Sequence, residues 1–381
     1  MSFTVLILLA VGVPIAYANG SNDVSKGIAT LVGSGVTDYR RAILWGTVWT
    51  GLGGLAGSLL AGAMIGTFGK GFLANGIAPT LPAAIATILG AAAWVGFATR
   101  AGLPVSTTHA IVGSVIGVGA TAYGFSGVSW AVVGTKIALP LLLSPIVALV
   151  ITALVLRSWK HFAVPVGDTA ECLCTALEPS SAAIAVAPDG ILAPLMANLP
   201  GVRLTIDSER ACVDERPSAF RITINDLHWL TSGTTSFARG MNDAPKMVAI
   251  VLATAAFSGS NAGFQTTAFL AVTLGMIAGS WSAGRRVTRV LAENITPMNH
   301  RQGFVANLVT ALLVGPGAVL GLPMSTTHVS AGAIVAVGAQ NSSETKWKTV
   351  REMILAWVVT LPAAALLAIL FYLLLRAAGA K

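Results

Sequence analysis

Two aspartates in the sequence stand where a charged side chain is costly. Asp23 lies in the stretch "ANGSNDVSK" and Asp243 in "ARGMNDAPK", and each follows an asparagine, Asn22 or Asn242, inside an otherwise apolar region. An ionisable group within a membrane segment is a functional-site hypothesis by default. A matched pair of carboxylates beside amide groups could bind a cation or accept a hydrogen bond from a polar substrate.

Each aspartate has basic neighbours. Lys26 and Lys246 follow their aspartates by three residues, and Arg239 precedes the second motif. One interpretation is that each lysine forms a structural salt bridge with its aspartate, since residues three apart on a helix are neighbours. The alternative is that these cations are built-in counter-charges for an anion.

A second pair of motifs, "LPVSTTH" and "LPMSTTH", has the composition of a helix start. A proline ends the preceding extended segment, and the hydroxyl side chains can cap the unpaired N–H groups of the first turn. The positive end of the helix dipole, free N–H groups and hydroxyls attract an oxyanion without a basic side chain. Ordinary capping of a membrane helix is the alternative. The hydroxyl residues are Ser106, Thr107, Thr108, Ser325, Thr326 and Thr327.

His109 and His328 follow these hydroxyl triplets. A histidine can gain or lose a proton near neutral pH, which makes the two residues candidates for proton coupling. A lone histidine in such a place is more often a hydrogen-bonded structural residue, and that interpretation stays open.

The chain that must position these groups is that of a polytopic membrane protein. Of its 381 residues 55% are hydrophobic and 10% are charged, and the mean hydropathy is +0.78. Soluble domains carry about 25% charged residues. Apolar runs such as "ALPLLLSPIVALVITALVL" reach the roughly 18 to 20 residues that a spanning helix needs. The net charge of +8 does not indicate nucleic-acid binding, because the basic residues cluster at the ends of these runs.

The sequence contains an internal duplication. The aspartate motifs are offset by 220 residues and the hydroxyl motifs by 219, in the same order, which chance rarely produces. Apolar segments number about five per half, and an odd number inverts the second copy. We therefore predict an all-α membrane protein of two inverted repeats with broken or re-entrant helices, residues 1–156 and 227–381, joined by a polar insert at 157–226. The predicted segments are 2–35 (interrupted), 42–66, 77–98, 106–123, 130–156, 227–257, 264–284, 303–320, 324–339 and 351–376.

The basic residues also predict the orientation of the chain. Twelve of them flank the apolar segments on one side and three on the other, and the basic side of a membrane protein faces the cytoplasm. This places the insert in the cytoplasm and both termini outside the cell (inner) membrane. Cys172, Cys174 and Cys212 all lie in the insert, match no zinc spacing and are expected to be free thiols. Alternating stretches such as "VRLTIDSE" predict a little β-structure there.

Three helix-breaking residues accompany the aspartates. Gly20, Gly240 and Pro245 predict that the helix unwinds at each aspartate motif, so that freed carbonyl and N–H groups line a cavity. A discontinuous helix near the bilayer midplane is typical of a transporter's binding site.

With these motifs in view, the chain resembles the inorganic phosphate transporter (PiT) family, whose hallmark is a duplicated "GANDVAN"-type signature followed in each half by a "PVSTTH"-type segment. Here the motifs read "GSNDVSK", "LPVSTTH", "GMNDAPK" and "LPMSTTH". The resemblance implies an inverted-repeat fold, often a homodimer, that moves phosphate with a proton or sodium ion by alternating access and uses no cofactor. It assigns Asn22, Asp23, Asn242 and Asp243 to substrate and cation binding, with the six hydroxyl residues around the phosphate.

The sequence departs from the family pattern near the aspartates. Lys26 and Lys246 stand where the family commonly has an asparagine, and Thr50 and Asn307 align approximately with family glutamates. Sodium prefers oxygen ligands. The departures therefore favour a proton over sodium as the coupling ion, although the two aspartates could still hold sodium.

Phosphate is the expected substrate because hydrogen phosphate carries an O–H donor that a buried aspartate can accept, whereas sulfate is fully ionised. The extra lysines and arginine would suit either dianion, so a sulfate or other oxyanion permease is the alternative. A membrane-embedded hydrolase is a further alternative, since Ser106 and His109 lie three residues apart. The duplication of these residues argues against an enzyme. A passive channel is also disfavoured, because it needs a continuous polar pore and no paired, broken motifs.

Overall fold

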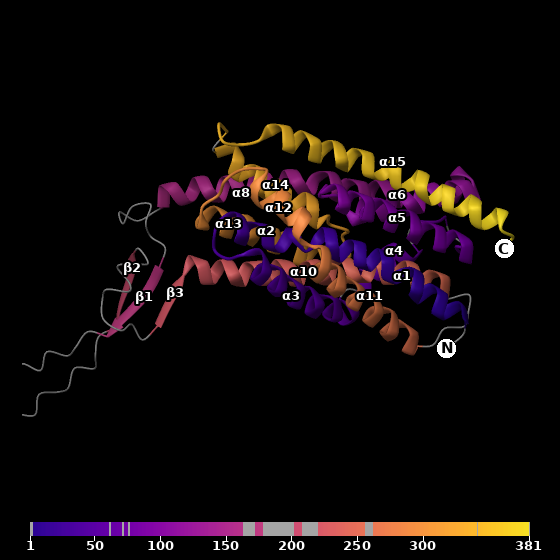
Figure 1. Cartoon of the computed structure of the whole chain (residues 1–381), viewed down its shortest axis with the longest axis horizontal. Coiled ribbons are helices and arrows are strands. Elements are labelled where there is room, and N and C mark those ends of the chain that lie inside the picture. The colour runs from indigo at the N-terminus through magenta and orange to yellow at the C-terminus, as the bar shows by residue number, and fades with distance from the viewer. Residues whose placement is uncertain are drawn as a thin grey trace, which may run out of the picture. The chain divides into compact units, whose positions relative to one another are not determined.

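The computed structural model describes residues 3–60, 62–70, 72–74, 77–162, 172–177, 202–207, 220–255, 262–340 and 342–380. The chain divides into two compact units. The membrane unit comprises residues 1–156 with 228–381, and the insert unit comprises residues 157–227. The membrane unit is built from helices, most of them long (Figure 1).

The first half of the membrane unit begins with two helices that are separated by a single residue. Short helical turns lie between its last two long helices. Its elements are α1 (Phe3–Asp23), α2 (Ser25–Gly33), α3 (Tyr39–Leu60), α4 (Gly62–Lys70), α5 (Leu81–Ala101), α6 (Thr107–Tyr123), η1 (Phe125–Gly127), α7 (Trp130–Val132), η2 (Val133–Ala138) and α8 (Leu139–Phe162).

The second half repeats this order of elements. By sequence offset α10 corresponds to α1 with α2, α11 to α3, α13 to α5, α14 to α6 and α15 to α7 with α8. The bounds are α10 (Ile224–Ala255), α11 (Ala262–Ala283), α12 (Arg285–Glu293), α13 (His300–Val319), α14 (Thr326–Gln340) and α15 (Trp347–Ala377).

Six helical stretches in the described part of the chain are long and apolar enough to cross a membrane: 39–60, 81–101, 130–159, 264–283, 300–319 and 347–377. Each of the ten predicted apolar segments overlaps a helix. Two of the remaining helices are shorter, since α6 has 17 residues and α14 has 15. The predicted segments are therefore helical.

The described part of the insert unit is a small antiparallel sheet. Strands β1 (Cys172–Leu177), β2 (Val202–Asp207) and β3 (Phe220–Thr223) pair in the order β2-β1-β3. This confirms the predicted β-structure. Cys172 and Cys174 lie in β1, and Cys212 falls outside the described residues.

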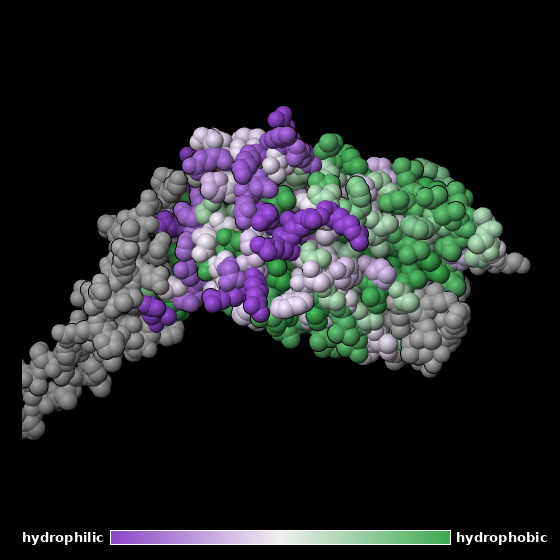
Figure 2. Space-filling model, in the orientation of Figure 1, coloured by the Kyte–Doolittle hydropathy of each residue, from purple (hydrophilic) through white to green (hydrophobic). Residues whose placement is uncertain are grey.

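The outer helices of the membrane unit present apolar side chains to their surroundings. Leucines on α8 and α15 are among the most exposed of the large hydrophobic residues, for example Leu142 (67%) and Leu366 (67%). Exposure of this extent suits a lipid environment. Figure 2 shows hydrophilic side chains gathered over the end of the unit that holds α12 and hydrophobic ones over the end where α15 finishes.

The prediction that the helix unwinds at the aspartate motifs is wrong for the second motif, and at the first motif the interruption is confined to Val24, where the Asn22 carbonyl oxygen accepts from the Ser25 and Lys26 side chains. α10 continues from Ile224 to Ala255 through Gly240 and Pro245, and the single residue between α1 and α2, Val24, keeps helical dihedral angles (φ −56°, ψ −32°). The glycines allow close packing instead. A Cβ on Gly20 would lie 2.1 Å from the Met276 carbonyl oxygen of α11, and one on Gly240 would lie 2.3 Å from the Thr50 carbonyl oxygen of α3.

Replacing Gly20 with alanine is expected to destabilise the protein, because the added methyl group would overlap the backbone of α11. Overpacking of this kind costs about 1–3 kcal/mol or more. The measurement is the thermal unfolding midpoint of the purified protein in detergent. Gly66→Ala is the matched control, since a Cβ on Gly66 in α4 meets nothing within 4 Å. Equal midpoints for the two variants would contradict the packing role.

The chain is interrupted just before α6 and α14 instead. Gly102 (φ +76°) and Gly321 (φ +70°) adopt the left-handed conformation, which ends a helix at little cost. The residues that follow each glycine are not helical and include Pro104 or Pro323. Since α5 packs against α6 and α13 against α14, each interruption joins two helices that lie against each other.

Candidate functional site

The four motifs converge on one buried group of side chains in the membrane unit. We call it the charge cluster and define it by the carboxylates, the basic groups and one amide that links them. The acidic and basic members are almost inaccessible, with exposed fractions of 0% for Lys26 and Arg239, and 4% for Asp243. Its members are Asn19, Asp23, Lys26, Arg239, Asp243 and Lys246.

Asn19 joins the two aspartates. Its Nδ2 donates to Oδ2 of Asp23 at 2.9 Å and to Oδ2 of Asp243 at 3.1 Å. Asn19 and Asp23 are four residues apart on α1, so their side chains lie on the same face of that helix. One amide therefore connects the aspartate motifs of the two halves.

The lysine of the first motif is held tightly. Lys26 Nζ donates to the Asn22 carbonyl oxygen at 2.7 Å, to Asn22 Oδ1 at 2.6 Å and to Asp23 Oδ1 at 2.8 Å. The other side of the Asn22 amide donates to Thr99 and to the Leu103 carbonyl oxygen, both at 3.0 Å. The first motif is thus fixed to the end of α5.

The lysine of the second motif reaches into the first half. Lys246 Nζ donates to Thr108 Oγ1 at 2.9 Å and to the Met324 carbonyl oxygen at 3.1 Å, and it lies 3.4 Å from Asp243 Oδ1. Asn242 donates to Asp243 Oδ1 (2.8 Å) and to the same Met324 carbonyl (3.1 Å). Both salt bridges expected between lysine and aspartate are present, but only Lys246 also contacts a hydroxyl triplet.

Arg239 supplies a third buried cation. Its guanidinium donates to Thr50 Oγ1 at 2.7 Å and lies 3.4 Å from Asn19 Oδ1 and 3.5 Å from Ser280 Oγ. Its Nε–H has no hydrogen-bond partner among the described residues. A buried charged donor without a partner is costly and indicates a group available to a ligand.

The hydroxyl triplets begin two helices that meet. Ser106 Oγ accepts from the His109 N–H at 3.2 Å and Ser325 Oγ accepts from the His328 N–H at 3.3 Å, which confirms the predicted capping. The two capping serines also bond to each other, with Ser325 Oγ donating to Ser106 Oγ at 2.9 Å. The N-termini of α6 and α14 therefore lie side by side.

The threonines of the triplets tie these helix starts to the aspartate motifs and to each other. Thr107 Oγ1 donates to Asp23 Oδ2 at 3.2 Å, Thr108 accepts from Lys246, and Thr327 Oγ1 donates to the Val105 carbonyl oxygen at 2.9 Å. Thr326 is buried at the first position of α14. Apart from Thr326, the predicted substrate-binding residues thus hydrogen-bond to one another or to neighbouring groups in one buried region.

The two histidine rings contact each other. The rings of His109 and His328 are 4.4 Å apart between centroids, and the His328 ring is 4.0 Å from that of Trp357. Both histidines line an apolar cavity of about 500 Å³ between α6, α8, α14 and α15. No hydrogen bond among the described residues joins either ring to an aspartate. His109 Nδ1 and His328 Nε2 have no hydrogen-bond partner in the described part of the chain, and proton coupling through these rings stays a prediction.

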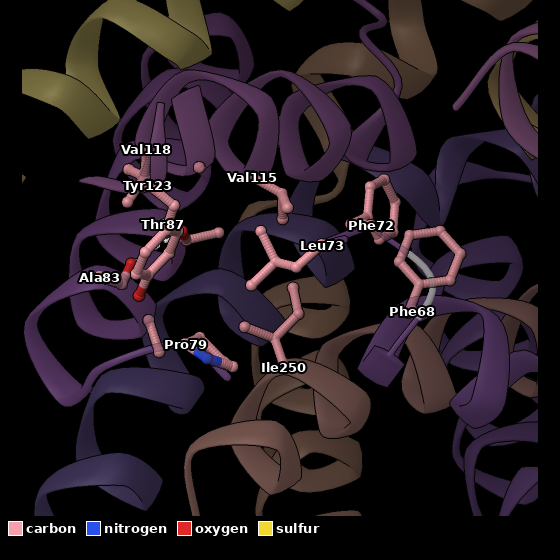
Figure 3. Close-up of a pocket in the computed structure, with 12 residues that line it drawn as sticks. Phe68, Phe72, Leu73, Pro79, Ala83, Thr87, Val115, Val118, Tyr123 and Ile250 are labelled. Atoms are coloured by element: carbon pink, nitrogen blue, oxygen red, sulfur yellow. Dashed lines mark hydrogen bonds between the residues drawn. The ribbon is translucent and has the colours of Figure 1, made fainter. Parts of the chain in front are cut away.

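A smaller apolar pocket, about 50 Å³, lies between α4, α5 and α6 and the end of α10. Figure 3 shows Phe68 and Phe72 at one end, Thr87 and Tyr123 at the other, and Ile250 between them. Its lining offers no charged group. Its link to the charge cluster is Phe68, whose ring centroid is 6.0 Å from Lys246 Nζ, within reach of a cation–π interaction.

Sequence reasoning missed three site residues, Asn19, Thr99 and Ser280. A signal for Asn19 existed, because it is the repeat equivalent of Arg239 at the offset of 220. Of the two residues aligned with family glutamates, Thr50 contacts Arg239, whereas Asn307 donates to the Gly27 carbonyl oxygen at 3.0 Å. Among the described residues, no group of three or more His, Cys, Asp or Glu side chains could hold a metal ion.

Comparisons with known proteins agree over nearly the whole chain. A family model described as the phosphate transporter family matches residues 19–368. A relative from Rhizobium meliloti, named "Probable low-affinity inorganic phosphate transporter", is 27% identical, with 98% of this chain and 97% of the relative covered. The chloroplastic inorganic phosphate transporter 2-1 of Arabidopsis thaliana is also 27% identical, with 95% and 70% covered.

A solved structure described as "The sodium-dependent phosphate transporter" superposes with a TM-score of 0.77 at 23% identity. The superposition covers 99% of this chain and 100% of that chain. The two chains therefore share a fold.

Proposed function

The chain belongs to the phosphate transporter family, and we propose on this premise that it is a symporter that moves inorganic phosphate across the membrane by alternating access. The helices would form two inverted repeats of about five membrane segments each, with the interruptions before α6 and α14 as the broken positions. Membership of a transporter family sets the hydrolase interpretation aside.

One observation carries the proposal: both copies of both motifs contribute to a single buried site. Asn19 of the first half bonds to Asp243 of the second, and Lys246 of the second half bonds to Thr108 of the first. A site shared between repeats is where a transporter of this kind binds its substrate, because movement of one repeat against the other then exposes it to either side.

The chemistry of this site suits an anion. Among the described residues, three fully buried basic side chains face two carboxylates, which leaves a formal excess of one positive charge. The paired N-termini of α6 and α14 add further positive potential. The partnerless Nε–H of Arg239 offers a donor. A phosphate anion would supply the negative charge and the acceptor oxygens that this arrangement lacks.

The aspartates favour phosphate over sulfate. Asp23 and Asp243 can each accept a hydrogen bond from a protonated phosphate oxygen, whereas sulfate presents acceptors only and would face them without compensation. Asn22, Asn242 and the hydroxyl triplets would complete the binding site. The sulfate or other oxyanion permease remains the alternative that the transport experiment below must exclude.

The proposed setting is the cell (inner) membrane, with the insert in the cytoplasm, both termini outside and the protein a homodimer. The start of α1 and the end of α15 lie at the same end of the membrane unit (Figure 1). The hydrophilic surface gathers at the other end (Figure 2), as the excess of cytoplasmic basic residues would require.

The coupling ion in this proposal is a proton. Asp23 and Asp243 are the candidate carriers, since both lie within the site and, among the described residues, no hydrogen bond joins a histidine ring to either aspartate. A sodium ion is the alternative coupling ion, because the family that this chain resembles has sodium-coupled members.

The test is uptake of labelled phosphate and labelled sulfate by reconstituted liposomes under an imposed proton or sodium gradient. We expect phosphate to accumulate when the outside is acidified. Uptake that ignores both gradients would contradict symport, and faster accumulation of sulfate would favour the alternative permease.

Replacing Lys246 with asparagine is expected to raise the KM for phosphate about tenfold, because a buried ammonium that contacts Thr108 is lost and charge-assisted hydrogen bonds are worth about 1.5–3 kcal/mol. The measurement is initial uptake rate against phosphate concentration. Lys348→Asn is the matched control: its side chain is 85% exposed and lies 3.9 Å from Glu352. An unchanged KM in Lys246→Asn would place this lysine outside the binding site.

A further inference from the structure

Lys26 stands in a set of oxygen atoms that would also suit a free cation. Its Nζ lies 2.6–2.8 Å from one backbone carbonyl, one amide oxygen and one carboxylate oxygen, supplied by Asn22 and Asp23. Carbonyl, amide and carboxylate oxygens are the ligands that hard cations take in proteins. The side chain is fully buried, so the ammonium is as shielded from water as a bound ion would be.

A sodium ion does not fit this place. Each of the three oxygens is already within hydrogen-bond distance of the ammonium, and a second positive charge at that distance would be strongly repelled in a buried site. We propose that the Lys26 ammonium is a tethered cation that takes the position of a diffusible sodium ion, which makes phosphate transport by this protein independent of sodium. The inference rests on the proposed function and concerns its coupling ion.

The charge balance of the site supports the same conclusion. A buried carboxylate such as Asp23 needs a positive partner, because an unpaired buried charge is strongly destabilising. A lysine three residues along the chain is covalently tethered beside the carboxylate and provides that partner without binding or leaving. A sodium ion would have to bind and leave in each transport cycle to do the same.

The equivalent lysine does not share this role. Lys246 Nζ lies 3.4 Å from its aspartate and makes its shorter bonds to Thr108 and to the Met324 carbonyl oxygen. The matching amide oxygen, Asn242 Oδ1, has no hydrogen-bond partner in the described part of the chain. The tethered-cation role therefore belongs to Lys26, whereas Lys246 would interact with the phosphate anion.

The test is to create the sodium site by the substitution Lys26→Asn, which removes the ammonium and adds an amide oxygen beside Asn22 and Asp23. Three measurements compare it with the wild type in sodium chloride and in potassium chloride of equal ionic strength. They are binding of radioactive sodium to the purified protein, its thermal unfolding midpoint, and phosphate uptake by liposomes.

For the wild type we expect no sodium binding and the same midpoint and uptake in both salts. For Lys26→Asn we expect sodium binding, a higher midpoint in sodium chloride, and uptake at least about tenfold faster with sodium, the ratio that about 1.4 kcal/mol of differential binding produces. Lys26→Met removes the charge but adds no oxygen, so it should bind no sodium. Lys348→Asn should behave as the wild type.

Sodium binding by the wild type would overturn the inference even if no variant folds. A folded Lys26→Asn that neither binds sodium nor responds to it would also overturn it. Lys26→Ser repeats the test with a smaller oxygen ligand. If the wild type moves no phosphate in either salt, the proposed function fails, while the binding and unfolding measurements still decide whether Lys26 replaces sodium.

Discussion

Asp23→Asn and Asp243→Asn are each expected to abolish concentrative phosphate uptake while leaving the protein folded. Asparagine keeps the size of the side chain and one acceptor oxygen, so the hydrogen bonds from Asn19 can persist. The negative charge that pairs with Lys26 or Lys246 is lost, together with the acceptor for a protonated phosphate oxygen. The measurement is labelled phosphate accumulated by liposomes under a proton gradient, with gel filtration to establish folding.

Asp38→Asn provides the matched control for this pair. Asp38 precedes α3, its Oδ1 accepts the Arg41 N–H at 3.0 Å, and its side chain is 59% exposed. Asparagine caps a helix as well as aspartate does, so transport should be unchanged. Full concentrative uptake by both site variants would reduce Asp23 and Asp243 to structural ion partners.

Arg239→Gln is expected to lower phosphate uptake at low substrate concentration by at least about thirtyfold, since truncating a member of a buried, hydrogen-bonded charge cluster costs about 2–5 kcal/mol. The variant removes the formal positive excess of the site and the donor to Thr50. Initial rates measured over a range of phosphate concentrations separate a loss of affinity from a loss of turnover.

Arg239→Lys should recover part of this loss, because it restores the charge without the planar fork of donors. Equal activity of Arg239→Gln and the wild type would show that the buried guanidinium does not act on the anion. A loss in Arg239→Gln that Arg239→Lys does not relieve would indicate a role in packing against Thr50 and Ser280 instead of charge.

Local chemistry made much of the site predictable from sequence. The "STTH" motifs predicted helix starts because a serine hydroxyl can accept a hydrogen bond from the backbone N–H three residues later. The structure has that bond at both Ser106 and Ser325. The salt bridges from Lys26 and Lys246 to their aspartates were likewise predictable from the sequence, since residues three apart on a helix are neighbours.

The unwinding predicted at Gly20 and Gly240 failed because a glycine has two uses that sequence alone does not separate. It can free the backbone to bend, or it can remove the side chain so that another helix approaches. The second use holds here, with the backbones of α11 and α3 where a Cβ would be. Only the positions of those partner helices, far away in sequence, decide between the two.

The contacts between the two halves could not be predicted from the sequence for the same reason. Nothing near Asn19 in sequence indicates that its amide reaches Asp243, and nothing near Thr108 indicates Lys246. Comparison of the repeats could have singled out Asn19, because its equivalent is the conspicuous Arg239. The geometry that joins them required the fold.

The difference between Asn19 and Arg239 has an energetic consequence for the proposed transport cycle. Two identical inverted repeats would make the inward-open and outward-open states equivalent by a two-fold rotation and therefore equal in free energy. Arg239 has no charged twin, since its equivalent is a neutral amide. This difference in charge removes the equivalence of the two states at the site, so the empty carrier would rest preferentially on one side of the membrane, and a neutral residue at position 239 should shift the ratio of the two populations.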